Sequence, residues 1–417
     1  MSFADQYLSR QSLQKGLIKE NPAEDLKFIV IIPSYNESGL LKSLDSLFKA
    51  VTPVSSVEII VNINWPEDTK AEIVNQSLDL FNEATKWASI KSTEKRKFYI
   101  LSSPSLKKKH AGVGLARKIA MDEAIVRLNS IDKKDGVICS FDADSICDPD
   151  YFQKLEEHFT KNPLTDGCSI YFEHPISGKE FQERIYQGII QYELHLRYYL
   201  QAFRFSGHPN CFHTVGSSFA VKADAYCRQG GMNKKKAGED FYFLQKIFDL
   251  GNFTECNTAR VIPSSRPSDR VPFGTGKVML EFLDSEINLQ TYNIRLFIEL
   301  KQFIDYISYT DPLTTNFKKD LFNAIPPVLA EFLESINFEA TLDEIILNSS
   351  GEKSFRKRFF RWFNMFRVMK FLNFGKTIYS DMEVRAAATT LLNMKKINIS
   401  ENDPEKLLII YRQLERN

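Results

Sequence analysis

Short apolar runs and amphipathic segments alternate along the first half of the chain. Four of the runs are rich in β-branched residues and continuous, which is typical of strands buried on both faces of a parallel sheet. These expected strands cover residues 27–32, 57–61, 97–101 and 136–141. Helical patterns follow them over residues 40–48, 69–88, 112–129 and 149–158. Strands that alternate with helices predict an α/β fold with a mainly parallel sheet.

The second half of the chain has a different pattern. A long helix is expected over residues 181–203, and after about residue 277 helical periodicity dominates to the end. We therefore expect a polar N-terminal leader at 1–26, an α/β domain at 27–275 and a C-terminal helical domain at 276–417. A chain of 417 residues is too long for one ordinary core, which agrees with this division.

Composition and charge narrow the classes of function. Lys and Arg number 54 and Asp and Glu 53, so the basic excess of a nucleic-acid-binding protein is missing and we expect no nucleic-acid partner. No apolar run approaches the ~20 residues of a membrane-spanning helix, and the first thirty residues lack the apolar stretch of a secretory signal. Six cysteines without a CxxC pair favour a reducing compartment. These features predict a cytoplasmic protein.

Two aspartates follow the fourth expected strand, in the sequence Asp142-Ala-Asp144. Ligands bind at the carboxyl ends of strands in parallel sheets, and two carboxylates at this spacing can both reach one divalent cation. Such a cation would neutralise a diphosphate. An isolated pair of this kind is more often a solvated turn or a helix cap, but its position at the end of a strand favours the metal-binding interpretation.

Four motifs, taken in order, resemble those of family 2 glycosyltransferases. They are Pro33-Ser-Tyr-Asn-Glu37, Gly112-Val-Gly-Leu-Ala-Arg117, Asp142-Ala-Asp144 and Gly238-Glu-Asp240. The resemblance covers about residues 27–275 and implies the Rossmann-like GT-A fold. It also implies transfer of one sugar from a nucleotide-diphospho-sugar, with a UDP-sugar favoured, to a hydroxyl of a glycan or a lipid-linked acceptor. Mn²⁺ or Mg²⁺ bound by the two aspartates and inversion of the anomeric centre belong to the same expectation.

The motif after the first strand is expected to form the nucleotide-binding side. By the resemblance, Pro33, Tyr35 and Glu37 would shape the pocket for the base and the ribose. Many family members carry Asp-Asp-Gly-Ser after the second strand, whereas this chain has Asn62-Ile-Asn-Trp65. The carboxylate that contacts uracil is therefore missing, and Asn64 is its nearest substitute.

Glycines and arginines are expected to serve the nucleotide and its phosphates. By the resemblance, Gly112 and Gly114 would let the backbone approach the nucleotide, and Arg117 would place a cation beside it. The segment lacks the third glycine of a dinucleotide fingerprint, so an NAD site is set aside. Downstream, Arg266 and Arg270 are placed to bind phosphate oxygens from a polar loop.

Three consecutive lysines, Lys107–Lys109, precede the glycine motif. Such a run can attract phosphate. A solvated loop is the commoner explanation, and the sequence favours it here.

Asp240 is the expected general base. An inverting transfer needs a carboxylate that takes the proton of the acceptor hydroxyl while its oxygen attacks the anomeric carbon. Glu239 would orient the acceptor. Alternatively, both carboxylates only stabilise the first turn of the helix that follows, where negative charge favours the helix dipole. The upstream pair of aspartates favours the catalytic interpretation.

Residues 353–376 contain eight Lys or Arg and no Asp or Glu, interleaved with aromatic residues. The residues Phe355, Phe359, Trp362, Phe366 and Met369 follow helical spacing and predict one stripe. The stripe could bind an anionic membrane surface peripherally, at the inner face of the membrane. Packing of the aromatics against the catalytic domain, with the cations left in solvent, is the favoured alternative.

Two other functions are compatible with the sequence. A nucleotidyltransferase on the same fold would usually show an N-terminal Gly-rich loop with a following Lys, whereas the first strand here ends in Pro-Ser-Tyr-Asn-Glu. A catalytically silent protein, either a nucleotide-sugar-binding protein or a scaffold, would not need the carboxylates of Asp142, Asp144 and Asp240, all of which are present.

Overall fold

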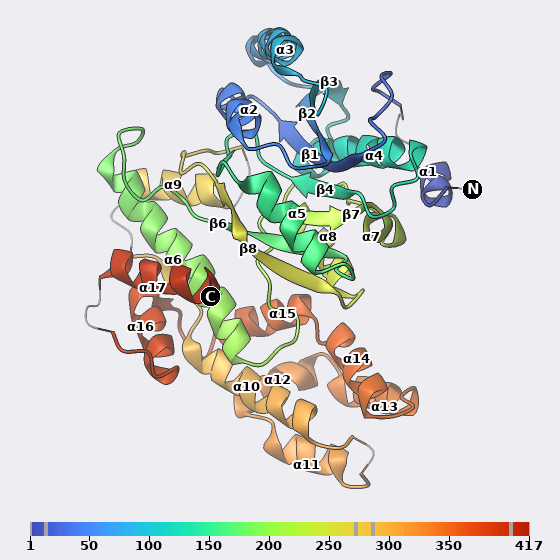
Figure 1. Ribbon diagram of the computed structural model, residues 1–417. Helices are drawn as coiled ribbons and strands as arrows, with labels where there is room; N and C mark the ends of the chain where they lie inside the picture. The colour runs from blue at the N-terminus through green and yellow to red at the C-terminus, as the bar shows by residue number, and fades with distance from the viewer. Residues whose placement is uncertain are drawn as a thin grey trace. The chain divides into compact units, whose positions relative to one another are not determined.

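Figure 1 shows the computed structural model of the chain. The structure describes residues 2–11, 16–270, 274–284, 288–312, 314–399 and 403–416. The chain divides into two compact units. We call residues 1–178, 214–277 and 415–417 the sheet unit, and residues 179–213 and 278–414 the helical unit. The division groups the expected helix at 181–203 with the C-terminal helices, and the domain boundary near residue 275 stays a prediction.

One eight-stranded sheet organises the sheet unit, with the strand order β3-β2-β1-β4-β7-β6-β8-β5. Its strands are β1 (Leu26–Ser34), β2 (Ser56–Pro66), β3 (Arg96–Leu106), β4 (Val137–Ser140), β5 (Ile146–Cys147), β6 (Gly167–Phe172), β7 (Phe219–Lys222) and β8 (Phe253–Ile262). The pairs β1·β2, β1·β4, β2·β3 and β6·β8 are parallel, whereas β7 and β5 run antiparallel to their neighbours. The expected α/β fold with a mainly parallel sheet is confirmed.

Helices cover this sheet and bury its central strands. They are α1 (Asp5–Ser9), α2 (Leu40–Lys49), α3 (Ala71–Lys91), α4 (Val113–Ser130), α5 (Tyr151–Lys161), α7 (Ala223–Arg228) and α8 (Glu239–Phe248). Helix α4 packs on β1 and β2, and α3 packs on β3 (Figure 1). The continuous apolar runs of β1 and β2 are buried on both faces, as the sequence predicts. This packing brings the carboxyl ends of β1, β2 and β4 to one edge of the sheet.

The N-terminal leader is attached to α4 by polar contacts. The hydroxyl of Tyr7 donates to Asp122 at 2.6 Å, and the backbone N–H groups of Leu17 and Ile18 donate to the carboxylate of Glu123. Asp122 and Glu123 are both buried, so the leader supplies hydrogen bonds to two carboxylates that are shielded from water. Residues 12–15 of the leader lie outside the described residues.

Helices make up nearly all of the helical unit. They are α6 (Glu183–Phe205), α10 (Ile294–Tyr309), α11 (Phe317–Ala324), α12 (Pro327–Ser335), α13 (Phe338–Leu347), α14 (Glu352–Trp362), α15 (Met365–Gly375), α16 (Val384–Met394) and α17 (Pro404–Arg416), with a two-stranded sheet of β9 (Gln290–Thr291) and β10 (Met382–Glu383). Helix α9 (Thr275–Asp284) crosses the division between the units, and α17 ends in the sheet unit. None of the described helices has the length and apolar character that a membrane span requires.

The basic, aromatic segment 353–376 forms two helices rather than the single stripe that its spacing predicts. The side chain of Asn364 accepts hydrogen bonds from the N–H groups of Phe366 and Arg367 and so begins α15 as a new helix. The aromatic residues of α14 point into the helical unit, where Phe355 and Phe359 are fully buried. Packing therefore accounts for these aromatics.

Candidate functional site

Glu37 anchors the first motif at the carboxyl end of β1, with only 4% of its surface exposed. Its Oε1 accepts a hydrogen bond from the N–H of Gly39 at 2.9 Å. Its Oε2 lies 2.5 Å from Arg266 and 2.8 Å from Arg270. Arg270 also donates to the backbone oxygen of Tyr35 at 2.9 Å. The polar loop after β8 is thus bound to the first motif through two arginines.

Asp144 lies beside the same two arginines. Its Oδ2 is 3.6 Å from Arg266 and 3.9 Å from Arg270. Burial, together with repulsion from Asp142 and Glu37, raises the pKa of Asp144 to about 6 against the opposing effect of the two arginines. Three carboxylates therefore repel one another at this edge of the sheet, and their ionised forms favour additional positive charge there.

Arg117 connects the second, third and fourth motifs. It lies in the first turns of α4, its side chain is 2% exposed, and it pairs with Glu239 at the start of α8 and with Asp142 at 2.7 Å. A Cβ atom at Gly216 would lie 3.0 Å from Nη2 of Arg117 and 3.1 Å from Oδ2 of Asp240. Gly216 therefore faces both the guanidinium group and the carboxylate of Asp240. Three of the four sequence motifs therefore meet around one buried arginine.

The two carboxylates at the start of α8 have raised proton affinity. Burial raises the pKa of Glu239 to about 7, although Arg117 acts in the opposite direction. Burial also raises the pKa of Asp240, again against the effect of Arg117. Oδ1 of Asp240 accepts a hydrogen bond from the N–H of Phe241 at 2.7 Å, so this oxygen is fixed by the helix start. A carboxylate with a raised pKa is a better proton acceptor than an ordinary aspartate.

The two glycines of the second motif lie against the loop before α8. A Cβ atom at Gly112 would come within 2.8 Å of the Cα of Lys236, and one at Gly114 would overlap the backbone oxygen of Lys235. Any side chain at these positions would push the loop away. The structure thus gives both glycines a packing role, and their expected approach to a nucleotide stays a prediction.

The expected base-binding residues lie at the ends of β1 and β2. Pro33 and Asn64 are buried, and Tyr35 is half-buried. The side-chain amide of Asn64 donates to the backbone oxygens of Ser34 at 3.0 Å and of Asn62 at 3.3 Å. These bonds fix the side-chain NH₂ of Asn64, which leaves its Oδ1 as the atom suited to accept a bond from a ligand.

Residues 29–227 match the model of the family described as glycosyl transferase family 2. The chain carries a family 2 glycosyltransferase domain. The enzyme class and the GT-A-like α/β fold with a C-terminal helical region, both expected from the sequence, are confirmed. The matched residues include the first three motifs. Asp240 and the loop that contains Arg266 and Arg270, called the arginine loop below, follow the matched residues.

Solved structures of S. aureus TarS are similar to the chain at 13% identity. The structure of its residues 1–349 has a TM-score of 0.39, and the structure of the same residues in complex with UDP-GlcNAc has a TM-score of 0.42. In each case the match covers 80% of this chain and 92% of the other. No curated protein matches the chain.

The carboxylates of the candidate site suit a divalent cation that keeps water or phosphate oxygens among its ligands. No group of three His, Cys, Asp or Glu that could hold a metal ion occurs in the described part of the chain. Mg²⁺ is commonly bound by only one or two carboxylates together with substrate phosphates. Asp142 and Asp144 provide two such carboxylates, and the repulsion that raises the pKa of Asp144 is what a cation would relieve. The residues therefore fit the expected metal.

One contributor to the site carries no recognisable sequence signal. Oδ1 of Asn233 accepts from the N–H of Lys235 at 3.0 Å, and its Nδ2 donates to the backbone oxygen of Glu239 at 2.8 Å. Asn233 thus fixes the loop before α8 to the first residue of that helix. A single asparagine in a loop matches no motif, so only the folded structure identifies it.

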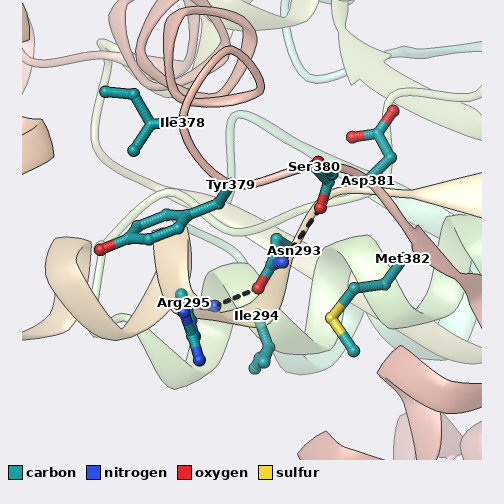
Figure 2. Close-up of a pocket in the computed structure, with 8 residues that line it drawn as sticks. All are labelled: Asn293, Ile294, Arg295, Ile378, Tyr379, Ser380, Asp381 and Met382. Atoms are coloured by element: carbon teal, nitrogen blue, oxygen red, sulfur yellow. Dashed lines mark hydrogen bonds between the residues drawn. The ribbon is translucent and has the colours of Figure 1, made fainter.

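A separate pocket of about 480 Å³ lies within the helical unit and is lined by residues 293–295 and 378–382. Figure 2 shows Asn293 donating to the backbone oxygen of Ser380 and accepting from the N–H of Arg295. These bonds cap the start of α10 and join Asn293 to Ser380, which belongs to the second segment that lines the pocket. None of the residues expected to act in catalysis lines this pocket.

Proposed function

We propose that the protein is an inverting glycosyltransferase that transfers one sugar from a UDP-sugar to a hydroxyl of a glycan or glycolipid. The observation that carries this proposal is the convergence of Asp142, Glu239 and Asp240 on Arg117, which lies with Asp142 among the residues that match the family 2 model. Donor-side and acceptor-side carboxylates of such an enzyme must lie close together, because the acceptor attacks as the diphosphate leaves. The arrangement in the sheet unit meets this requirement.

The donor would bind at the carboxyl ends of β1 and β2. Pro33, Tyr35 and Glu37 would shape its pocket, and Oδ1 of Asn64 would accept a hydrogen bond from the base. Uracil offers such a donor at N3–H, guanine at N1–H and cytosine at its N4 amino group. This contact fits all three bases, so the preference for a UDP-sugar rests on the resemblance to family 2 glycosyltransferases, and the measurement below separates the three donors.

Positive charge for the diphosphate would come from the arginine loop and from a metal ion. Arg266 and Arg270 are half-exposed and would exchange part of their pairing with Glu37 for phosphate oxygens, to which guanidinium groups bind in pairs of hydrogen bonds. Asp142 and Asp144 would hold Mn²⁺ or Mg²⁺. When bound, this ion supplies charge that stabilises the leaving diphosphate.

Asp240 would act as the general base. Its raised pKa suits it to take the proton of the acceptor hydroxyl while that oxygen attacks the anomeric carbon from the face opposite the diphosphate. Oδ2 is the atom assigned to this step, because Oδ1 is bound to the N–H of Phe241. Glu239 would orient the acceptor from the same helix turn, while Arg117 keeps it in place.

Replacement of Asp240 by Asn tests this assignment. We expect turnover to fall by roughly 10²–10⁴-fold while the dissociation constant of the donor stays unchanged, because the amide cannot accept the proton. The matched control is Asp224→Asn, which changes a half-exposed aspartate of the same unit that pairs with Arg228. Unchanged turnover in Asp240→Asn would refute the assignment of the base.

The donor is identified by thermal unfolding with UDP, GDP, CDP and their sugars, with and without Mn²⁺. Ligand at about a hundred times its dissociation constant adds ~2.7 kcal/mol of stability, which gives a readable shift of the midpoint. We expect a metal-dependent shift with UDP that disappears in the Asp142→Ala/Asp144→Ala variant. A shift with GDP alone would assign a different donor, and no shift with any nucleotide would favour a silent scaffold.

We also propose a cytoplasmic location with peripheral contact to an anionic membrane through residues 353–376. Phe355 and Phe359 of α14 are buried, so such contact would be mainly electrostatic and would use the exposed cations Lys353, Lys357, Arg358 and Arg361. Co-sedimentation with anionic vesicles should then occur at low salt and disappear at high salt. Failure to bind at low salt would contradict the contact.

A further inference from the structure

Two lysine-rich loops lie on the surface of the sheet unit. The first contains Lys107–Lys109 and forms a turn in which the N–H groups of His110 and Ala111 donate to the backbone oxygen of Lys107 at 2.8 and 2.9 Å. The second contains Lys234–Lys236 and leads into α8. All six lysines are exposed.

The fold brings these two loops together. Gly112, just after the first loop, approaches the second so closely that its Cβ would lie 2.8 Å from the Cα of Lys236. Asp68 pairs with Lys108 at 2.7 Å and also interacts electrostatically with Lys236. We call the six lysines of the two loops the lysine rim.

The lysine rim concentrates positive charge on a chain that is nearly neutral overall. The formal net charge of the whole protein is +1, so six adjacent lysines are a local excess. Glu67, whose carboxylate accepts from the N–H of Lys108, and Asp68 neutralise only part of it. Like charges held together on a surface repel one another, and a polyvalent anion relieves this repulsion.

The rim adjoins the start of α8, where the proposed general base lies. Asn233 bonds to both Lys235 and Glu239 and so holds the second loop against this helix start. Lys236 precedes Asp240 by four residues, which limits their separation to about 14 Å of extended chain. A ligand on the rim is therefore within reach of the acceptor side of the reaction.

We propose that the lysine rim binds phosphate groups of the acceptor, so that the acceptor is a phosphate-bearing glycan chain rather than a neutral sugar. This inference rests on the proposed glycosyltransferase function. The donor diphosphate already has Arg266, Arg270 and the paired aspartates for its binding, whereas the rim flanks Asp240, which must meet the acceptor hydroxyl. Six ammonium groups on two loops suit several phosphates along one chain.

The test compares two triple variants with inorganic polyphosphate as the probe. In the rim variant Lys234, Lys235 and Lys236 are each replaced by Gln. In the control variant three exposed lysines elsewhere in the same unit, Lys86, Lys134 and Lys161, are replaced by Gln. We expect the rim variant to bind polyphosphate roughly tenfold more weakly and with a smaller salt dependence, because fewer counterions are released. The control variant should bind like the original protein.

Binding of UDP with Mn²⁺, measured on the same samples, separates the inference from the proposed function. The rim variant should keep the dissociation constant for UDP and the thermal midpoint of the original protein. Equal weakening of polyphosphate binding in both variants, or weaker UDP binding in the rim variant alone, would overturn the inference. Binding of UDP but not of polyphosphate by the original protein would also overturn the inference. That result would not contradict the proposed function.

A third arm uses vesicles of phosphatidylglycerol, because lipid headgroups also present phosphates. The rim variant should retain whatever vesicle binding the original protein has. If it loses vesicle binding and keeps polyphosphate binding, the rim serves a membrane and the acceptor assignment is wrong.

Discussion

Arg117 and Glu239 pair in the interior of the sheet unit, although 122 positions separate them in the chain. Both side chains are almost completely buried, with 2% and 4% of their surfaces exposed. A buried ion pair of this kind is costly to break, because removal of one partner leaves the other charged and desolvated. The pair also joins the start of α4 to the start of α8, and so fixes the helix turn that carries the proposed base.

Replacement of Arg117 by Met should destabilise the protein by about 3–5 kcal/mol, because Glu239 and Asp142 lose their buried partner. The double variant Arg117→Met/Glu239→Gln should be less destabilised than the sum of the two single changes. Urea unfolding of the four proteins measures this coupling. Additive effects of the two changes would contradict the energetic role of the pair.

A second buried pair in the same unit provides the control. Arg127 and Glu58 are both 3% exposed and lie on α4 and β2. Arg127→Met should cost a similar free energy of unfolding. Arg117→Met should in addition weaken catalysis at temperatures where both variants remain folded, and equal activities in the two variants would show that the Arg117 pair matters for stability alone.

Four of the eight strands of the sheet, β1 to β4, were predicted from the sequence because these strands carry their signal locally. The continuous apolar runs of β1 and β2 and the aspartates directly after β4 are visible without any knowledge of distant residues. Helix α4 was also predicted close to its observed bounds, but the partners of its buried charges were not. It buries Arg117 and Arg127, whose carboxylate partners Glu239 and Glu58 come from distant parts of the chain.

The residues of the candidate site could be predicted from the sequence, but the contacts between them could not. The motifs name Glu37, Arg117 and Asp240, whereas the pairing of Glu37 with Arg270 joins segments more than half the chain apart. The resemblance places Gly112 beside a nucleotide, and only the folded chain shows the loop before α8 packed against it. Such contacts depend on tertiary structure, which neither periodicity nor spacing encodes.

Replacement of Gly114 by Ala should disturb the site despite the higher helix propensity of alanine. The new Cβ would overlap the backbone oxygen of Lys235, so the loop before α8 must move. We expect a loss of about 1–3 kcal/mol of stability and a loss of turnover greater than in other variants of similar stability. Gly351→Ala is the control, because no atom lies within 4 Å of its Cβ position and its φ of 163° is extended backbone. Equal thermal midpoints in both variants would contradict the proposed clash.

The leader should contribute to stability through Tyr7. Its hydroxyl donates to Asp122 at 2.6 Å and accepts from Lys118 at 2.9 Å, within the buried region of α4. Tyr7→Phe leaves these groups without one of their partners and should cost about 1–3 kcal/mol in urea unfolding. Tyr309→Phe, at a position that is 84% exposed, should have almost no effect. If both variants unfold at the same urea concentration, the leader contributes no stability through this contact.

His208 makes the stability of the helical unit depend on pH. Its ring stacks on Phe203, Nδ1 accepts from the N–H of Asn210 at 3.2 Å, and Nε2 donates to the backbone oxygen of Phe363 at 2.8 Å. Burial lowers the pKa of His208 to about 4, because a second ring proton would be desolvated. The unfolded chain has an ordinary histidine pKa of about 6.5, so it binds more protons than the folded chain between about pH 6.5 and pH 4.

Stability should therefore fall as the pH falls through this window. For His208 alone we expect a loss of about 2 kcal/mol between pH 7 and pH 5. The variant His208→Gln cannot take up this proton. It should be less stable than the original protein at pH 7, through loss of the ring contacts, and the difference should shrink by about 2 kcal/mol at pH 5. Urea unfolding of both proteins at both pH values measures this change. A constant gap for His208→Gln would show that His208 titrates alike in the folded and unfolded chains.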